Sequence, residues 1–153
     1  MGSGFTKLWA ASGISNLGDG IFGAAFPLLV ASITRDPVAV AAATVVNRAP
    51  WLLFALIAGA MADRLDRQRM MVIMNIARGV LVGVMALLVA GDALQLPTLY
   101  VIAFLLGVAE VFFDTSSEAF IPSLVENDML PAANGRLQAT EWSANAFVGP
   151  PLG

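Results

Sequence analysis

The chain is 153 residues long, a length typical of one soluble domain, but its composition excludes that class. Hydrophobic residues make up 58% and charged residues 12%, whereas soluble domains carry about 25% charged residues. So few charges cannot cover a water-facing surface, and we therefore expect a membrane protein. The chain has no Cys and no His, which excludes disulfides and Ser-His-Asp triads. A net charge of −3 without a basic patch excludes a nucleic-acid partner.

Four hydrophobic runs are long enough to cross a bilayer as α-helices. A helix needs about 20 apolar residues to cross a hydrocarbon core of roughly 30 Å. The runs cover residues 8–33, 37–62, 70–90 and 99–121, and short segments with charges, Gly or Pro separate them. The alternating pattern of a membrane β-barrel strand is absent, so the predicted fold is an all-α integral membrane bundle.

The sequence after the fourth run predicts a surface connection and then an incomplete fifth span. Residues 123–138 interleave apolar and acidic side chains, which favours the membrane interface, and Asn134-Gly135 predicts a turn. A new apolar run begins at Ala139 and reaches Gly153 after 15 residues, too few to cross the bilayer. We therefore expect residues 1–153 to be an incomplete N-terminal transmembrane half, inactive in transport by itself.

The basic residues predict the orientation of the helices. With a cytoplasmic N-terminus, most basic residues outside the spans lie on the cytoplasmic side and only Arg35 lies on the other, as the positive-inside rule requires. The cytoplasmic set is Lys7, Arg64, Arg67, Arg69 and Arg136. We therefore expect a multi-pass protein of the plasma membrane with its N-terminus in the cytoplasm.

Charged residues inside the spans are costly in lipid and indicate function. They are Asp19, Arg48, Arg78, Glu110, Asp114 and Glu118. Other polar residues share faces with them at helical spacing, among them Ser12, Asn16, Glu141 and Asn145. Interhelical hydrogen bonding explains the Ser and Asn residues well and the charges poorly. Depth along the helices, taken at about 1.5 Å per residue, pairs Arg48 with Glu110 or Asp19, and Arg78 with Asp114 or Glu118.

The four carboxylates inside the spans outnumber the two arginines. A carboxylate that faces an arginine stays ionised, whereas one in a low-dielectric site without a counter-charge tends to hold a proton. Glu118 escapes this if it reaches the cytoplasmic interface. Because the chain has no His, these carboxylates are the expected proton carriers, as in the carboxylate relays of transporters.

Residues 59–69, GAMADRLDRQR, resemble the G-x-x-x-D-R-x-x-R signature between helices 2 and 3 of the major facilitator superfamily. Gly59 permits close packing, Asp63 can accept hydrogen bonds from a neighbouring helix N-terminus, and Arg64 and Arg67 supply latch charges. The resemblance implies that this loop keeps the cytoplasmic side closed. A positive-inside cluster without a gating role is the alternative. Asp66 departs from the family, in which many members have Gly.

Three further stretches resemble exporters of this superfamily. Residues 16–20, followed by Ala25-Phe26-Pro27, are similar to the first helices of drug exporters, and residues 149–153, GPPLG, to the G-P-x-x-G motif of antiporter helix 5. Residues 106–114 and the loop after them resemble the macrolide-efflux and enterobactin-exporter-like branch. Gly79-x-x-x-Gly83 predicts close helix packing.

One departure concerns proton coupling. Proton-linked exporters of the superfamily often have an Arg four residues before the glycine of helix 4. Before Gly107 this position is Ala103, which excludes coupling through that arginine. Arg78 or Arg48 would then have to take over its role.

The resemblance implies a bacterial secondary transporter of about twelve helices, of which this chain holds helices 1–4 and the start of helix 5. The implied activity is proton-coupled export of amphipathic drugs or macrolide-like compounds. Its expected partners are the small-molecule substrate, protons, the lipid bilayer and the remainder of the transporter. Asp19, Glu110 and Asp114 would line the cavity, while Gly149, Pro150 and Gly153 would shape helix 5.

Three alternatives stay open at this point. They are a siderophore or lysolipid exporter of the same fold, a facilitator without proton coupling, and a non-transporting helical membrane scaffold. Without His, Cys or a motif around the serines, we expect no enzyme activity, no cofactor and no metal.

Overall fold

The computed structural model describes residues 2–152, which form helices joined by short links, with no strand in that range. Four long helices come first: α1 (Ser3–Ile33), α2 (Pro37–Arg64), α3 (Arg67–Ala90) and α4 (Leu96–Phe120). All four are long and apolar enough to cross a membrane. The all-α membrane fold predicted from the hydrophobic runs is thus confirmed.

The chain after α4 consists of shorter elements. Two 3₁₀ turns, η1 (Ile121–Ser123) and η2 (Asn127–Met129), lead into helix α5 (Leu130–Trp142). A π-helical turn, η3 (Ser143–Val148), continues α5, and a 3₁₀ turn, η4 (Pro150–Leu152), follows it.

Asn134 and Gly135 lie inside α5, so the turn predicted at these residues is wrong. Pro131 in the first turn of α5 starts the helix upstream of them. Asn and Gly each disfavour a helix by only about 1 kcal/mol or less. Packing of the neighbouring Ala133, which is fully buried, offsets that cost.

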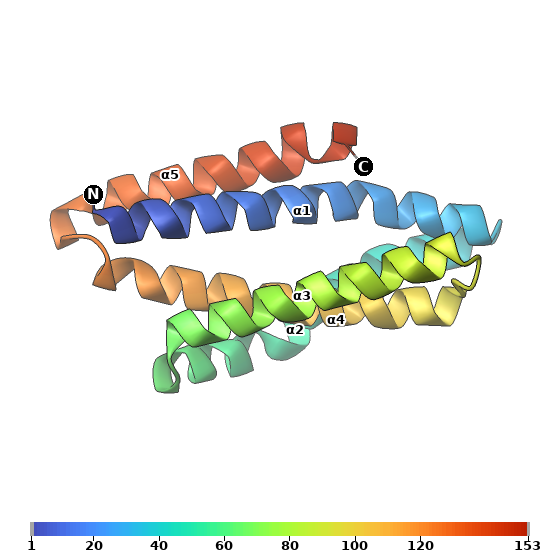
Figure 1. Cartoon of the computed structure of the whole chain (residues 1–153), viewed down its shortest axis with the longest axis horizontal. Helices are drawn as coiled ribbons and strands as arrows, with labels where there is room; N and C mark the ends of the chain where they lie inside the picture. Colours follow the sequence, from blue (N-terminus) through green and yellow to red (C-terminus); the bar gives the residue numbers. More distant parts are fainter. Residues whose placement is uncertain (1, 153) are drawn as a thin grey trace. The chain divides into compact units, whose positions relative to one another are not determined.

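The described residues form two compact units. The first unit contains residues 2–25 and 117–152, which include most of α1 together with α5. The second contains residues 26–116, which include the end of α1, all of α2 and α3, and most of α4. In the first unit α1 and α5 lie side by side and run in the same direction (Figure 1).

Aspartate caps set the starts of two helices. An Asp36 carboxylate oxygen accepts from the Val38 N–H at 2.9 Å, and Pro37 follows as the first residue of α2, where its missing N–H leaves no bond unmade. Asp66 caps α3 in the same way. At the end of α3, Asp92 adopts a left-handed conformation with φ of 51°, which lets the chain turn towards α4.

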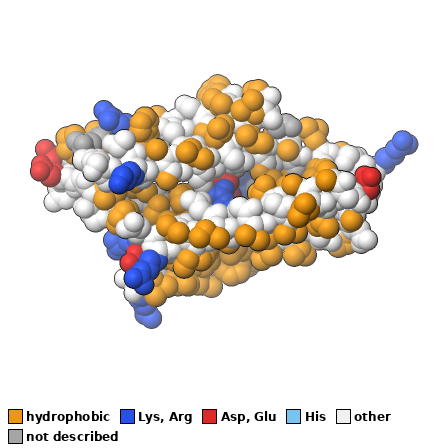
Figure 2. All heavy atoms as spheres, in the orientation of Figure 1, with side chains coloured by type: hydrophobic (Ala, Val, Ile, Leu, Met, Phe, Trp, Pro, Cys, Tyr) orange, Lys and Arg blue, Asp and Glu red, His pale blue; other side chains and the backbone are white. Residues whose placement is uncertain are grey.

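Much of the surface of the described residues is apolar. Figure 2 shows many hydrophobic side chains on one face, with Lys, Arg, Asp and Glu confined to a few places. On α2, Leu52 is 89% exposed and Leu56 is 90% exposed. An apolar surface of this kind suits lipid or other helices better than water.

Candidate functional site

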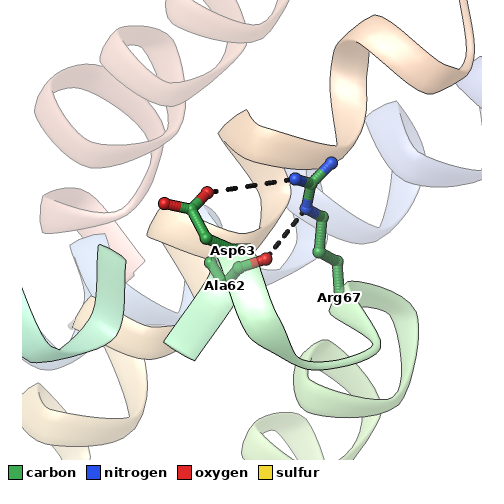
Figure 3. Close-up of polar contacts among 3 residues, drawn as sticks. All are labelled: Ala62, Asp63 and Arg67. Atoms are coloured by element: carbon green, nitrogen blue, oxygen red, sulfur yellow. Dashed lines mark hydrogen bonds and ion pairs between the residues drawn. The ribbon is translucent and has the colours of Figure 1, made fainter. Parts of the chain in front are cut away.

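The link between α2 and α3 carries the predicted gating residues. Only two residues join the end of α2 at Arg64 to the start of α3 at Arg67. The Arg67 guanidinium donates through Nε to the carbonyl of Ala62 at 3.0 Å, and its Nη2 lies 4.0 Å from Oδ1 of Asp63 (Figure 3). Arg67 therefore ties the first turn of α3 to the last turn of α2. Arg64 itself is exposed.

Asp66 fills the capping role that the sequence suggested for Asp63. Oδ1 of Asp66 accepts from the Arg69 N–H at 3.0 Å, and Oδ2 of Asp66 lies 3.5 Å from Nε of Arg69. This cap gives a structural reason for the Asp at this position. The Asp63 side chain is 79% exposed, and the helix N-terminus nearest to it in sequence, that of α3, already has its cap.

Two other predicted residues on α2 lie open. A Cβ built at Gly59 meets no atom of the described residues within 4 Å, so none of them makes the close approach expected there. Arg48 is exposed. Its pairing with Glu110 or Asp19 stays a prediction.

The second unit places Arg78 of α3 near two carboxylates of α4. Arg78 interacts electrostatically with both Glu110 and Asp114, which lie about one turn apart on α4. All three residues are half-buried. Of the two partners predicted for Arg78, the structure brings Asp114 near and adds Glu110. With all three groups ionised, this charged group carries a net charge of −1.

Close packing of α4 on α2 holds Glu110 in place. A Cβ at Gly107, one turn before Glu110, would lie 2.8 Å from Cγ of Pro50, a fully buried residue of α2. Near the start of α4, the Tyr100 hydroxyl donates to the carbonyl of Ala39 on α2. The two carboxylates of the charged group therefore lie on a helix that is fixed to α2 at two levels.

In the first unit the predicted helix-5 motif lies after α5 and η3, where this part of the chain crosses α1. A Cβ at Gly149 would come within 2.5 Å of Cα of Gly20, so the two backbones touch at this crossing. Pro150 follows as the exposed first residue of η4. Gly153, the last residue of the motif, lies outside the described residues.

Asp19 lies beside this crossing. It is half-buried on α1, one residue before Gly20. One turn earlier, the buried Asn16 accepts a hydrogen bond from the Asn145 side chain of η3 at 3.4 Å. The amide of Asn16 also donates to the carbonyl of Ser12 at 2.9 Å. Polar contacts of α1 with α5 and η3 therefore reach to within one turn of the predicted acidic residue.

Glu118, the last predicted site residue, lies exposed near the end of α4. It belongs to the first unit, where it interacts electrostatically with Glu141 of α5. When both carboxylates are ionised, Glu118 and Glu141 therefore repel each other. The structure groups Arg78, Glu110 and Asp114 in one unit, and places Asp19 and Glu118 in the other.

The close-packing glycines Gly20 and Gly107 were missed at the sequence level. Each lies within three residues of a predicted carboxylate, which is the only signal the sequence offers. Gly79 and Gly83, whose spacing predicted packing, meet no atom of the described residues within 4 Å. The close approaches therefore occur at glycines other than those in the predicted packing motif.

Four apolar helices of membrane-spanning length, joined by short links, are the architecture of a multi-pass membrane protein. The family described as transmembrane secretion effector matches residues 2–153, and the chain belongs to this family. The resemblance to the superfamily is thereby confirmed, whereas the macrolide-efflux and enterobactin-exporter-like branch stays a prediction. Members of this family are transporters. No curated protein and no solved structure matches the chain.

Proposed function

We propose that the protein takes part in proton-coupled export of amphipathic drugs or macrolide-like compounds across the plasma membrane of a bacterial cell. Family membership supports transport in general. The observation that carries the finer proposal is the pair of carboxylates, Glu110 and Asp114, that act on the single guanidinium of Arg78. One guanidinium cannot neutralise two carboxylates, and excess negative charge within a membrane span favours binding of a proton or a cation.

Exchange follows from this charge balance. With one proton on Glu110 or Asp114, the charged group is neutral. When that proton leaves, the group carries one negative charge, which a cationic part of the substrate can neutralise instead. Proton and substrate then compete for one charge, and this competition is the basis of antiport. Asp19 of α1 offers another carboxylate for the same chemistry.

The remaining roles follow from the positions of the loops. We assign the cytoplasmic side to the α2–α3 link because basic residues gather there, which also places the N-terminus in the cytoplasm. Asp63, Arg64 and Arg67 then gate that side. The other helices of the transporter supply the remainder of the substrate path.

The test is export of ethidium, an amphipathic cation, from everted membrane vesicles that contain the full-length transporter, with and without a pH gradient. We expect Glu110→Gln and Asp114→Asn each to lower gradient-driven export by about tenfold or more, which corresponds to about 1.4 kcal/mol. Asp92→Asn, in the α3–α4 link, is the matched control and should leave export unchanged. Gradient-driven export at the wild-type rate after combined replacement of Asp19, Glu110 and Asp114 by amides would refute coupling through these acids. If the wild-type protein exports ethidium equally well without a pH gradient, the transporter is a facilitator without proton coupling.

A further inference from the structure

Two glycines let α1 touch η3 and the residue after it, the continuation of α5, beside Asp19. A Cβ at Gly20 would lie 2.6 Å from the carbonyl oxygen of Ala144 and 2.9 Å from Cα of Asn145. A Cβ at Gly149 would lie 2.5 Å from Cα of Gly20. These distances are shorter than any ordinary contact of a Cβ, and the atoms met are backbone atoms, which cannot rotate away. Any side chain at either position must therefore push the two helices apart.

Hydrogen bonds fix the register of the same two helices. The Trp9 indole donates to the Thr140 hydroxyl at 2.8 Å, and Asn145 donates to Asn16 at 3.4 Å. These bonds and the glycine contact follow one another in the same order along both helices. Because Asn16 lies three residues before Asp19, the last hydrogen bond and the glycine contact lie on either side of Asp19 along α1.

The backbone that continues α5 is specialised at the crossing. It leaves the α-helical pattern in the π-helical turn Ser143–Val148, and the Gly149 N–H donates to the Ala144 carbonyl, five residues back, at 2.7 Å. The same carbonyl oxygen is the atom that a Cβ at Gly20 would strike. The wide turn therefore contributes a backbone carbonyl to the crossing. Single π-helical turns occur often at functional sites.

We propose that Gly20 and Gly149, together with Asn16 and Asn145 through their hydrogen bond, are positioning residues for Asp19. They set the distance of its backbone from α5, and with it the surroundings in which the carboxylate binds and releases a proton. The proposal rests on the proposed function for its consequence, since Asp19 is taken there as a carrier of protons or substrate charge. It goes beyond that function because it assigns roles to residues that touch neither proton nor substrate.

The first unit holds six other charged groups among the described residues. They are Lys7 on α1, Glu118 near the end of α4, Glu126 and Asp128 at η2, and Arg136 and Glu141 on α5. None of them is changed in the variants below. A change in the titration of Asp19 in those variants therefore reports the altered helix contact.

The experiment compares two glycines that flank Asp19 on α1. Gly20→Ala inserts a methyl group into the crossing. The methyl group added by Gly18→Ala meets no atom of the described residues within 4 Å. The purified full-length transporter is titrated with acid, and the Asp19 carboxyl band is followed by infrared spectroscopy. Each variant is also made with Asp19→Asn, so that the difference spectrum isolates Asp19.

We expect Gly20→Ala to move the titration midpoint of Asp19 by about one pH unit or more, a tenfold change in proton affinity. The midpoint in Gly18→Ala should stay at the wild-type value. The pH optimum of ethidium export should follow the midpoint, so that it moves in Gly20→Ala and stays unchanged in Gly18→Ala. A folded Gly20→Ala protein with the wild-type midpoint overturns the proposal. So does an equal shift in Gly18→Ala.

A second variant keeps the proposal testable if Gly20→Ala does not fold. Asn145→Ala removes the hydrogen bond to Asn16 and adds no volume, and we expect it to shift the midpoint by less than Gly20→Ala would. An unchanged midpoint in Asn145→Ala would then overturn the proposal. Export by Asp19→Asn separates this result from the proposed function. Wild-type coupled export in Asp19→Asn would refute coupling through Asp19, while the titration would still decide whether the crossing positions its carboxylate.

Discussion

The packing of Gly107 against Pro50 gives a sharp prediction of stability. A methyl group at Gly107 would lie 2.8 Å from Cγ of Pro50, which is 0.6 Å less than the 3.4 Å at which ordinary contact begins. The proline ring cannot turn away, because it is bonded to its own backbone and is fully buried. Relief therefore requires α4 to move away from α2, and overpacking of this kind costs about 1–3 kcal/mol.

Replacement of a helical Gly by Ala also stabilises the helix itself, by about 1 kcal/mol. Gly107→Ala should therefore lower the free energy of unfolding by about 0–2 kcal/mol in total. Gly79→Ala on α3 is the matched control, because no atom of the described residues lies within 4 Å of the added methyl group. It should raise that free energy by up to about 1 kcal/mol. The difference between the two variants, about 1–3 kcal/mol, isolates the contact with Pro50.

The assay is equilibrium unfolding of the purified protein in mixed micelles by SDS, followed by far-ultraviolet circular dichroism. A Gly107→Ala protein as stable as the Gly79→Ala protein would refute the reasoning. It would show that α4 can leave Pro50 without loss, and that close packing does not hold Glu110 in place.

Two smaller predictions use the same assay. Asp66→Ala removes the cap of α3 and should lower the free energy of unfolding by about 0.5–2 kcal/mol, whereas Asp66→Asn keeps a capping oxygen and should change it little. Equal losses in both would mean that charge, not the cap, is what Asp66 supplies. Tyr100→Phe removes the hydrogen bond to the Ala39 carbonyl and should lower the free energy by about 1 kcal/mol. No loss in this variant would show that the bond adds nothing to the packing of α4 on α2.

The long helices were predictable because each hydrophobic run is long and ends at a signal with a local cause. Pro37 after Asp36, and the turn at Asp92, act within a few residues, so sequence alone places these boundaries well. The turn predicted at Asn134-Gly135 failed because a weak local preference met a helix that had already started at Leu130. Helix boundaries that depend on local chemistry can be predicted from the sequence, whereas those that depend on packing cannot.

The sequence indicates which residue types make up the candidate site, but it does not indicate their arrangement. Hydropathy indicates that Arg78 and Asp114 are out of place in lipid, and depth along the helices brings them to similar levels. Neither hydropathy nor depth reveals which glycine faces a neighbouring helix. Gly107 and Gly79 both lie in apolar helices, yet only the first meets another helix among the described residues. That difference depends on the direction each glycine faces in the folded unit, and no short-range pattern encodes it.

The pairing of α1 with α5 has a consequence for biosynthesis. Asn16 and its partner Asn145 are separated by 129 positions, so at 5–20 residues per second α1 waits roughly 6–26 s for its neighbour to be made. During that interval the polar face of α1 lies in the membrane or the insertion machinery before α5 is available to pack against it. The hydrogen bonds from the Asn16 amide to the carbonyl and hydroxyl of Ser12 lie within α1 itself and need no second helix. The nascent first helix can therefore satisfy part of its own polar stripe until the fifth helix emerges from the ribosome.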